Sequence, residues 1–351
     1  MPGNAVVSVG NLWGRVRDAD LWDFCGVPER VVLLHNWLVW IVYPPGVRMW
    51  GGAPVADSAS ALAAPGPIVL LEQALADLDA AILFSADAQA PSHTVVTVLG
   101  MEDPRVPGAL GRYLVGALAG AVDIDALLCE DLLAHGADRR AELASTVEGI
   151  IGKTNVLGTR DAQMFRDTRR NAWIGEGVGH ALLMLAARHE TSFIQGRLRT
   201  LSAVHPTPTR QGLDSVSTYV SQGVLAVGIG ESKATCSYGS EQLTEAAKLF
   251  AQVDKGVFGP DLRAELAAFR RVLPDELAVQ VSDSLWSQNG CYLPMIVHQD
   301  EFNVMAQRPT LASLAPPIEQ RRLIVSRLTD FHAFFDAVAD AMRAAVPEVV
   351  C

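Results

Sequence analysis

The sequence lacks the closely spaced cysteine pairs that hold disulfide-rich domains and zinc ribbons together. Its cysteines are odd in number and widely scattered, at Cys25, Cys129, Cys236, Cys291 and Cys351, and no Cys-x-x-Cys pair occurs. Such spacing is typical of reduced thiols in a cytoplasm. We therefore expect neither a disulfide framework nor a structural zinc site.

An uninterrupted apolar run of membrane-spanning length is missing as well. The most apolar windows, residues 31–43 and 106–128, are too short or are broken by Arg112, Asp123 and Asp125. The start of the chain shows no basic segment followed by an apolar core, so we expect no signal peptide. These absences predict a soluble, cytoplasmic protein that does not bind a membrane.

A general excess of basic charge is also absent. The 351 residues carry 28 Lys and Arg against 39 Asp and Glu, a net charge of -11, which argues against a protein coated in positive charge for unspecific binding of nucleic acid. A local basic groove is compatible with this balance. Half of the residues are apolar, and glycine and proline are spread throughout, so the composition favours a globular mixed fold over disorder or a coiled coil.

The length allows two domains, each with a full hydrophobic core. We predict an N-terminal α/β domain over residues 1–145, with a docking or regulatory role, and a second α/β domain over residues 146–351. Residues 30–43 are rich in β-branched and aromatic side chains and predict one long strand or two short ones. Residues after Gly108 show helical spacing up to position 150, with expected breaks near Gly120 and Gly136.

The most informative stretch is an apolar run, Val224–Ile229, that lies between two glycines. Its composition predicts a central strand buried on both faces, and it leads directly into Glu231, Ser232 and Lys233. Because side chains alternate along a strand, Glu231 and Lys233 leave it on the same face. A carboxylate and an ammonium are costly to place there for packing alone, so the pair predicts a polar site.

Two further acids precede this strand. Asp214 stands at the predicted start of the neighbouring strand, and Glu176 lies on a predicted helix, residues 173–187, one turn before His180. Three glycines in this helix let it lie close against a sheet, which brings Glu176 near the strand ends. Carboxylates in this arrangement can hold Mg²⁺, and a metal-bound water can attack a phosphate in line. Lys233 can position that water or stabilise the developing charge.

The spacing of these residues has a counterpart in a known family. Asp214, sixteen intervening residues and then Glu231-x-Lys233 resemble the PD-(D/E)xK nuclease superfamily, with Leu213 in place of the family's proline. The resemblance covers roughly residues 155–297. It implies a restriction-endonuclease-like fold, a mixed central sheet flanked by helices, and a DNA endonuclease that uses Mg²⁺ or Mn²⁺. The metal ligands that it implies are Glu176, Asp214, Glu231 and the backbone carbonyl of Ser232, with Lys233 as the catalytic lysine.

His180 and Gln242 are candidates for a supporting role, in which a residue contacts the metal ligands and not the metal itself. Gln242, early in the following helix, lies where RecB-like members of the superfamily carry Gln-x-x-x-Tyr. Ala246 replaces the tyrosine, so this chain departs from that branch.

A second resemblance rests on the runs GEGVGHALLMLA, GLDSV and GIGESKA, together with a separate N-terminal α/β region. This combination is similar to the nuclease subunit of the Hachiman antiphage-defence system, the HamA-like proteins. The resemblance implies DNA as the substrate and a helicase partner that restrains the nuclease. Residues 1–145 are then the expected docking surface.

Arginine dominates the charges between residues 158 and 210, just before the predicted site. Arg188, Arg197, Arg199 and Arg210 are the candidates for a track that binds the phosphates of a nucleic acid. A solvated helix face is the alternative interpretation of the same residues.

Other interpretations of the chain stay open. A non-catalytic module can keep the nuclease fold to bind a nucleic-acid end or a partner protein, with Glu231 and Lys233 as an ordinary surface ion pair. A thiol enzyme built on Cys236 is weaker, because no histidine stands at a recognisable spacing from it. The run from His298 to Asn303 is interpreted as the exposed end of a strand rather than a metal cluster.

Overall fold

The computed structural model describes residues 66–129, 139–188, 196–207 and 212–349, with the backbone alone for 121–129 and 139. Two short strands before these ranges, β1 (Val32–Leu34) and β2 (Trp37–Val39), are also described, and they pair antiparallel. The prediction of strands within residues 30–43 is thereby confirmed in its two-strand form.

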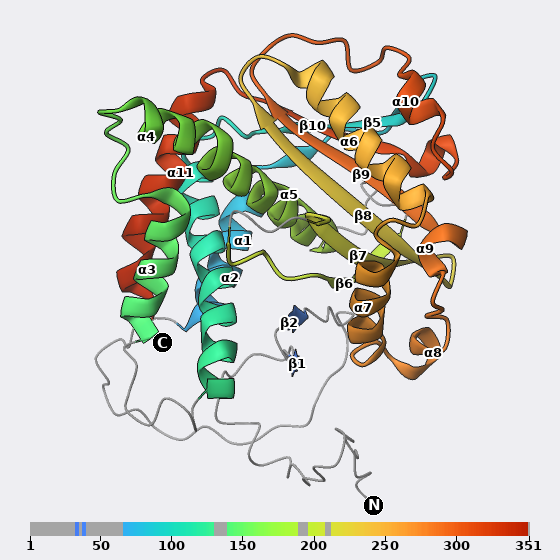
Figure 1. The fold of residues 1–351 in the computed structure, drawn as a ribbon, viewed down its shortest axis with the longest axis horizontal. Coiled ribbons are helices and arrows are strands. Elements are labelled where there is room, and N and C mark those ends of the chain that lie inside the picture. Colours follow the sequence, from blue (N-terminus) through green and yellow to red (C-terminus); the bar gives the residue numbers. More distant parts are fainter. Residues whose placement is uncertain are drawn as a thin grey trace, which may run out of the picture.

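A mixed sheet forms the centre of the described chain (Figure 1). Its strands are β3 (Leu83–Phe84), β4 (Ala88–Gln89), β5 (Thr94–Leu99), β6 (Arg197–Leu201), β7 (Ser215–Ser221), β8 (Val224–Thr235), β9 (Gly290–His298) and β10 (Arg322–Arg327). They follow the order β3-β5-β10-β9-β8-β7-β6, and β4 pairs with β5. Strands β8, β9, β10 and β5 run parallel, while β7 is antiparallel to β8 and β6 to β7. The carboxyl ends of four strands therefore share one edge of the sheet.

Helices cover both faces of this sheet. They are α1 (Pro67–Asp79), α2 (Arg105–Cys129), α3 (Arg139–Ile151), α4 (Arg160–Phe165), α5 (Asn171–Arg188), α6 (Gly239–Asp254), α7 (Gly259–Arg270), α8 (Asp275–Ala278), α9 (Leu285–Gln288), α10 (Pro309–Ala312) and α11 (Phe331–Ala345). A π-helical turn, Arg166–Arg170, joins α4 to α5. None of the described helices is long and apolar enough to cross a membrane.

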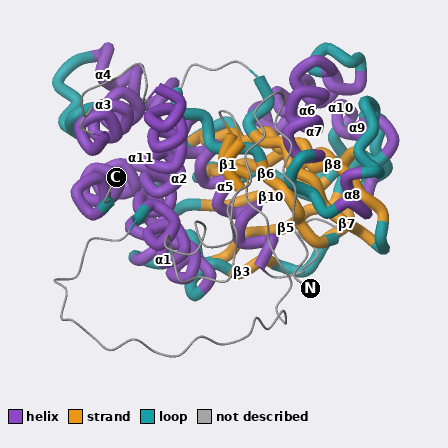
Figure 2. The backbone as a smooth tube through the Cα atoms, turned by 90° about the horizontal axis from the view of Figure 1, so that it is seen from below, coloured by secondary structure: helices purple, strands orange, loops and turns teal. Residues whose placement is uncertain are grey.

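Two hydrophobic cores lie on opposite sides of the sheet, and Figure 2 shows the strands between two groups of helices. The first core joins α1, α2, α5 and α11 to one face through residues such as Tyr113, Leu182 and Phe335. The second joins α6 and α7 to the other face, where Phe250 stacks on Tyr292 with ring centroids 4.6 Å apart. The chain thus has the mixed α/β architecture with a helix-flanked sheet that the sequence predicts.

Helix α2 runs without interruption through Gly120, so the break predicted there is wrong. Two other glycines of this helix explain its close packing. A Cβ atom at Gly111 would lie 2.5 Å from the Cβ of Ala341 in α11, and one at Gly116 would lie 3.1 Å from the Cβ of Leu71 in α1. Close contact with two neighbouring helices offsets the poor helix propensity of glycine here.

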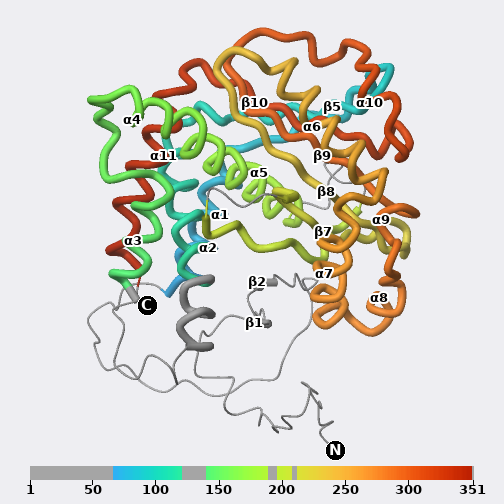
Figure 3. The backbone as a smooth tube through the Cα atoms, in the orientation of Figure 1, coloured from blue at the N-terminus to red at the C-terminus, as the bar shows by residue number. Residues whose placement is uncertain are grey.

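Distant parts of the chain meet in this fold. Figure 3 shows β5, near the start of the described ranges, beside β10 near the C-terminus, and the two strands pair in parallel from Thr94 opposite Arg322 onward. Helix α2 packs against α11 in the same core. Residues 66–129 therefore share a sheet and a core with residues 146–351, whereas β1 and β2 form a separate two-stranded sheet.

Candidate functional site

The predicted buried strand is longer than expected. We predicted residues 224–229, but β8 continues through Gly230 and the polar triplet to Thr235. Its partner β7 begins at Ser215, opposite Gly230, so the segment after Gly230 pairs with β9 on one side only. The polar residues thus lie within a central strand, at the point where one neighbouring strand has ended.

Asp214 occupies this open side of β8. Its carboxylate Oδ2 accepts a hydrogen bond from the backbone N–H of Ser232 at 2.7 Å, in place of the missing strand partner. A side-chain oxygen therefore satisfies a buried backbone donor, which is costly to leave unpaired. This bond places Asp214 directly beside Glu231, as the sequence predicts.

Glu231 and Lys233 leave the strand on the same face and form an ion pair, with Lys233 Nζ 2.5 Å from Glu231 Oε1. The Glu231 side chain is 4 % exposed and that of Lys233 is 30 % exposed, so this is not a surface pair. The second carboxylate oxygen of Glu231, Oε2, is buried and has no hydrogen-bond partner among the described residues. An unpartnered buried carboxylate oxygen is unfavourable unless another group binds it.

Helix α5 lies against this strand (Figure 1), and its glycines make the contact. A Cβ atom at Gly175 would lie 2.8 Å from the Cβ of Ala234, and one at Gly179 would overlap the hydroxyl of Ser232. Only residues without a side chain allow the helix to approach β8 so closely. The prediction that small residues let α5 lie against the sheet is confirmed, and Glu176 sits between these two contact points on the helix.

The pKa values of Glu176 and Asp214 are raised by burial and by the charges of neighbouring acids. Burial, followed by the charge of Glu231, raises the pKa of Glu176 to about 7. Burial, followed by the charges of Glu231 and Glu176, raises the pKa of Asp214 well above its ordinary value. Burial also raises the pKa of Glu231, although Lys233 opposes the rise. These mutual effects are those of acids that lie near one another, with Glu231 buried and Glu176 and Asp214 half-buried.

Lys233 is the cation of this cluster. Burial by itself would lower the pKa of Lys233, but the charges of Glu231, Asp214 and Glu176 outweigh it and raise the pKa above its ordinary value. The ammonium therefore stays charged across the neutral range. One cation among three acids leaves the cluster with an excess of negative charge when all three are ionised.

One observation favours a metal ion in this cluster and another argues against it. The donors are carboxylate oxygens, which Mg²⁺ and Mn²⁺ prefer, and Glu231 Oε2 is a buried oxygen in need of a partner. However, within the described ranges no group of three or more His, Cys, Asp or Glu side chains is placed so that it could hold a metal ion. The chemistry of the donors fits a hard cation, while the side chains as placed do not form a closed ligand cage.

His180 lies one turn further along α5 but does not contact the acids in the way that a ligand would. Its Nε2 is 2.8 Å from the carbonyl oxygen of Ser202, so Nε2 carries the proton, and Nδ1 accepts a hydrogen bond of 2.5 Å from the hydroxyl of Tyr113. Burial lowers the pKa of His180 to about 4. The neutral ring fixes Ser202, whose side-chain oxygen accepts the N–H of Val216 near the start of β7. His180 thus supports the strand that follows Asp214.

Gln242 lies in the first turn of α6 and is half-buried. Its backbone N–H donates to the carbonyl oxygen of Tyr238 at 2.9 Å. No hydrogen bond found for the described residues joins the Gln242 side chain to the three acids. A supporting role for Gln242 stays a prediction.

The arginines chosen from the sequence lie away from the acids. Arg188 ends α5 twelve residues after Glu176, about 18 Å along the helix at 1.5 Å per residue. Arg197 is opposite Val220 on the edge strand β6, near the end of β7 that lies farthest from Asp214. Arg199 follows on the same strand, and Arg210 lies outside the described residues. The structure does not bring Arg188, Arg197 and Arg199 next to the acid cluster.

The interpretation of residues 298–303 as an exposed strand end is wrong for its first member. His298 is the last residue of the central strand β9 and is 4 % exposed. It is buried because β8 and β10 flank it, opposite Thr235 and Arg327. Only the parallel pairing of strands far apart in the sequence reveals this position.

Comparison of the chain with protein-family models and with curated proteins finds no match in either.

Proposed function

We propose that this chain is a metal-dependent nuclease of the PD-(D/E)xK type, which hydrolyses phosphodiester bonds of DNA. The observation that carries the proposal is the group on β8: Lys233 pairs with Glu231 at 2.5 Å, Asp214 accepts the N–H of Ser232 between them at 2.7 Å, and the helix of Glu176 packs on the same strand. The order α5, β6, β7, β8 and α6 also agrees with the order of elements expected from the resemblance. Placing the buried carboxylate of Glu231 with the half-buried carboxylates of Asp214 and Glu176 destabilises the fold, so a role beyond packing accounts for them better.

The roles of the residues follow from their chemistry. Asp214, Glu231 and Glu176 supply carboxylate oxygens for Mg²⁺ or Mn²⁺, together with the backbone carbonyl of Ser232. When bound, the metal neutralises phosphate charge and lowers the pKa of a water. Lys233, held by Glu231, places a positive charge where negative charge develops on the phosphate. The hydrogen bond from Ser232 N–H keeps the Asp214 carboxylate turned toward the cluster.

Cleavage of supercoiled plasmid by the purified chain tests this proposal. We expect nicking or linearisation with Mg²⁺ or Mn²⁺ and none with EDTA. Lys233→Ala should lose the activity, whereas Lys248→Ala, which removes an exposed lysine paired with Glu245 on α6, should keep it. Equal cleavage by wild type and Lys233→Ala would refute the assignment of the site.

We also propose that the nuclease is the effector of an antiphage-defence system and is restrained by a helicase subunit, with DNA as the shared substrate. This part rests on the resemblance to HamA-like proteins and on residues 1–145 as the docking surface. Co-expression with a helicase subunit of such a system should suppress plasmid cleavage until DNA damage or phage infection. Unchanged cleavage in the presence of that helicase would argue against restraint.

A non-catalytic module is the second candidate. The observation that favours it is the absence, within the described residues, of a three-ligand group as the side chains are placed, with Lys233 already paired to Glu231. Such a module should bind DNA ends equally well with and without EDTA. Charge reversal of Arg197 or Arg199 would then weaken binding, and Lys233→Ala would change nothing.

A further inference from the structure

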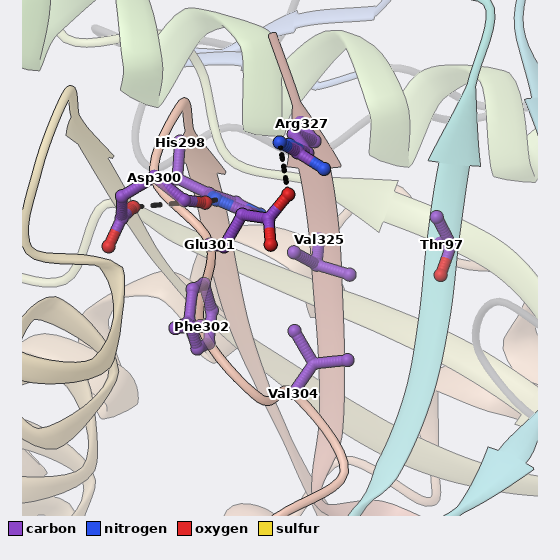
Figure 4. A pocket seen from close by; sticks show the side chains of 8 residues that line it. All are labelled: Thr97, His298, Asp300, Glu301, Phe302, Val304, Val325 and Arg327. Atoms are coloured by element: carbon purple, nitrogen blue, oxygen red, sulfur yellow. Dashed lines mark hydrogen bonds and ion pairs between the residues drawn. The ribbon is translucent and has the colours of Figure 1, made fainter.

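A pocket of about 270 Å³ opens at the carboxyl ends of the parallel strands (Figure 4). Its polar lining comes from Thr97 on β5, Arg327 on β10, and His298, Asp300 and Glu301 at the end of β9. Phe302 and two valines supply the apolar lining. Ligands of open α/β sheets bind outside the carboxyl ends of their strands, so the position is that of a binding site.

The pocket lies on the same face of the sheet as Lys233. In the parallel register Lys233 is opposite Ile296, which is opposite Val325, which is opposite Thr97. Residues opposite one another in neighbouring strands point to the same face. Two strand spacings separate Lys233 from Val325 in the pocket wall, about 10 Å at 4.7 to 4.9 Å per spacing. Lys233, with Glu231 two residues before it, and the pocket are thus neighbouring features of one face of the sheet.

The turn between β8 and α6 connects the two features. Asp300 Oδ2 in the pocket lies 3.2 Å from the backbone N of Gly239, which donates to it at the start of α6. A Cβ atom at Gly239 would lie 2.5 Å from the ring of Phe302, so this turn packs directly on the pocket wall. Tyr238, the residue before, is 60 % exposed. An exposed aromatic side chain at this place offers a surface on which a base can stack.

The chemistry of the pocket selects a planar ring with both donors and acceptors at its edge. His298 Nδ1 donates to the carbonyl oxygen of Asp300 at 2.8 Å, so Nε2 is the unprotonated acceptor. Arg327 contributes donors, and its pairing with Glu301 at 2.8 Å joins two exposed side chains. Such an exposed pair is weak and can open for a ligand. The carboxylates of Asp300 and Glu301 repel a simple anion, and the guanidinium of Arg327 repels a simple cation. A neutral aromatic heterocycle is compatible with both kinds of charge and can pack on Phe302.

We propose that this pocket holds one nucleobase of the substrate strand whose phosphate lies at the acid cluster. The inference rests on the proposed function and narrows its substrate. A base inserted here cannot stay paired with its complement, so the enzyme should prefer single-stranded DNA or the unpaired ends of a duplex. Tyr238 is the stacking surface between the pocket and the acids.

Binding of a fluorescent single-stranded oligonucleotide in EDTA tests the proposal, with full-length Lys233→Ala protein so that no cleavage occurs. Phe302→Ala removes the aromatic wall, and Thr97→Phe fills the pocket from the opposite strand. Each should weaken binding about tenfold, since stacking of one base contributes roughly 1 to 3 kcal/mol and 1.4 kcal/mol is a factor of ten. Lys248→Ala is the matched control and should bind normally. Circular dichroism confirms that each variant is folded.

The outcomes separate this proposal from the nuclease assignment. Binding by a folded Thr97→Phe variant within twofold of the control overturns the base pocket, whatever the cleavage assay shows. Weakened binding by both pocket variants supports the base pocket even if the wild type fails to cleave DNA. In that case only the nuclease assignment is refuted. If dAMP competes as well as the oligonucleotide does, at equal concentration, the pocket serves a free nucleotide and the assignment to the substrate strand is wrong.

Discussion

Replacement of Glu176 by glutamine should stabilise the metal-free protein at neutral and alkaline pH. Glu176 is half-buried on α5, and desolvation followed by the charge of Glu231 raises its pKa from the ordinary value of 4.5 to about 7. A carboxyl whose pKa is higher in the folded state binds its proton more tightly there than in the unfolded chain. The folded state therefore loses stability as the pH rises from 4.5 to 7. Glutamine has the same shape and cannot ionise, so the variant avoids this loss.

The magnitude follows from the size of the rise. A change of one pKa unit corresponds to 1.36 kcal/mol, so the rise from 4.5 to about 7 is equivalent to about 3 kcal/mol. Near pH 4 Glu176 is protonated in both states, and the two proteins should be equally stable. At pH 8 the variant should be more stable by up to about 3 kcal/mol. This is a large share of the 5 to 15 kcal/mol typical of a folded domain.

Urea unfolding in EDTA at pH 4, 6 and 8 measures this difference. Glu245→Gln serves as the control, because Glu245 is an exposed acid in an i,i+3 pair with Lys248 and should change stability by less than about 0.5 kcal/mol at every pH. Parallel pH profiles for wild type and Glu176→Gln would refute the reasoning, since they would mean that Glu176 is not held beside the other acids.

Three further predictions follow from the same geometry. Gly179→Ala should lower the free energy of unfolding by about 1 to 3 kcal/mol in a thermal melt, because its Cβ would overlap Ser232. The control Gly149→Ala, whose Cβ would have nothing within 4 Å, should be neutral or stabilise α3 by about 0.5 to 1 kcal/mol. Mg²⁺ at 100 times its Kd should stabilise the wild type by about 2.7 kcal/mol in a melting assay, and Asp214→Asn should respond less at the same concentration. Tyr113→Phe should destabilise the protein by about 1 kcal/mol and leave the metal response intact, because it removes only the hydrogen bond to His180; loss of the metal response would show that His180 acts on the site directly.

Local sequence patterns were sufficient to predict many features of the site and of the elements around it. The elements around the site, from the glycine-bearing helix through the strand of Glu231 to the helix after it, were predicted in their correct order. Alternation placed Glu231 and Lys233 on one face, and the ion pair between them confirms it. These features depend on backbone periodicity and on residues near one another in sequence, so they can be inferred from a single chain. Strand β8 is longer than the sequence predicts, because Gly230, which resembles a strand end, lies opposite Ser215 in the ladder.

Other features depended on contacts that no local pattern contains. The pairing of β5 with β10 joins residues more than two hundred positions apart, and it creates the surface on which Thr97 and Arg327 meet. Arg188 and Arg197 are close to Asp214 in sequence but distant from it in space, because Arg188 ends an 18-residue helix and Arg197 lies on an antiparallel edge strand; their role in binding phosphates stays a prediction.

The sequence by itself determined which residues can ionise, which segments alternate or turn with a helical period, and where glycine allows a helix to approach a strand. The tertiary structure alone decided that Glu231 is buried beside Asp214 and Lys233, that His298 is covered by strands on both sides, and that a pocket opens on the face to which Lys233 points. The physical reason is that burial and charge interaction depend on distance in space, and the parallel sheet sets those distances by pairing strands that the chain keeps far apart.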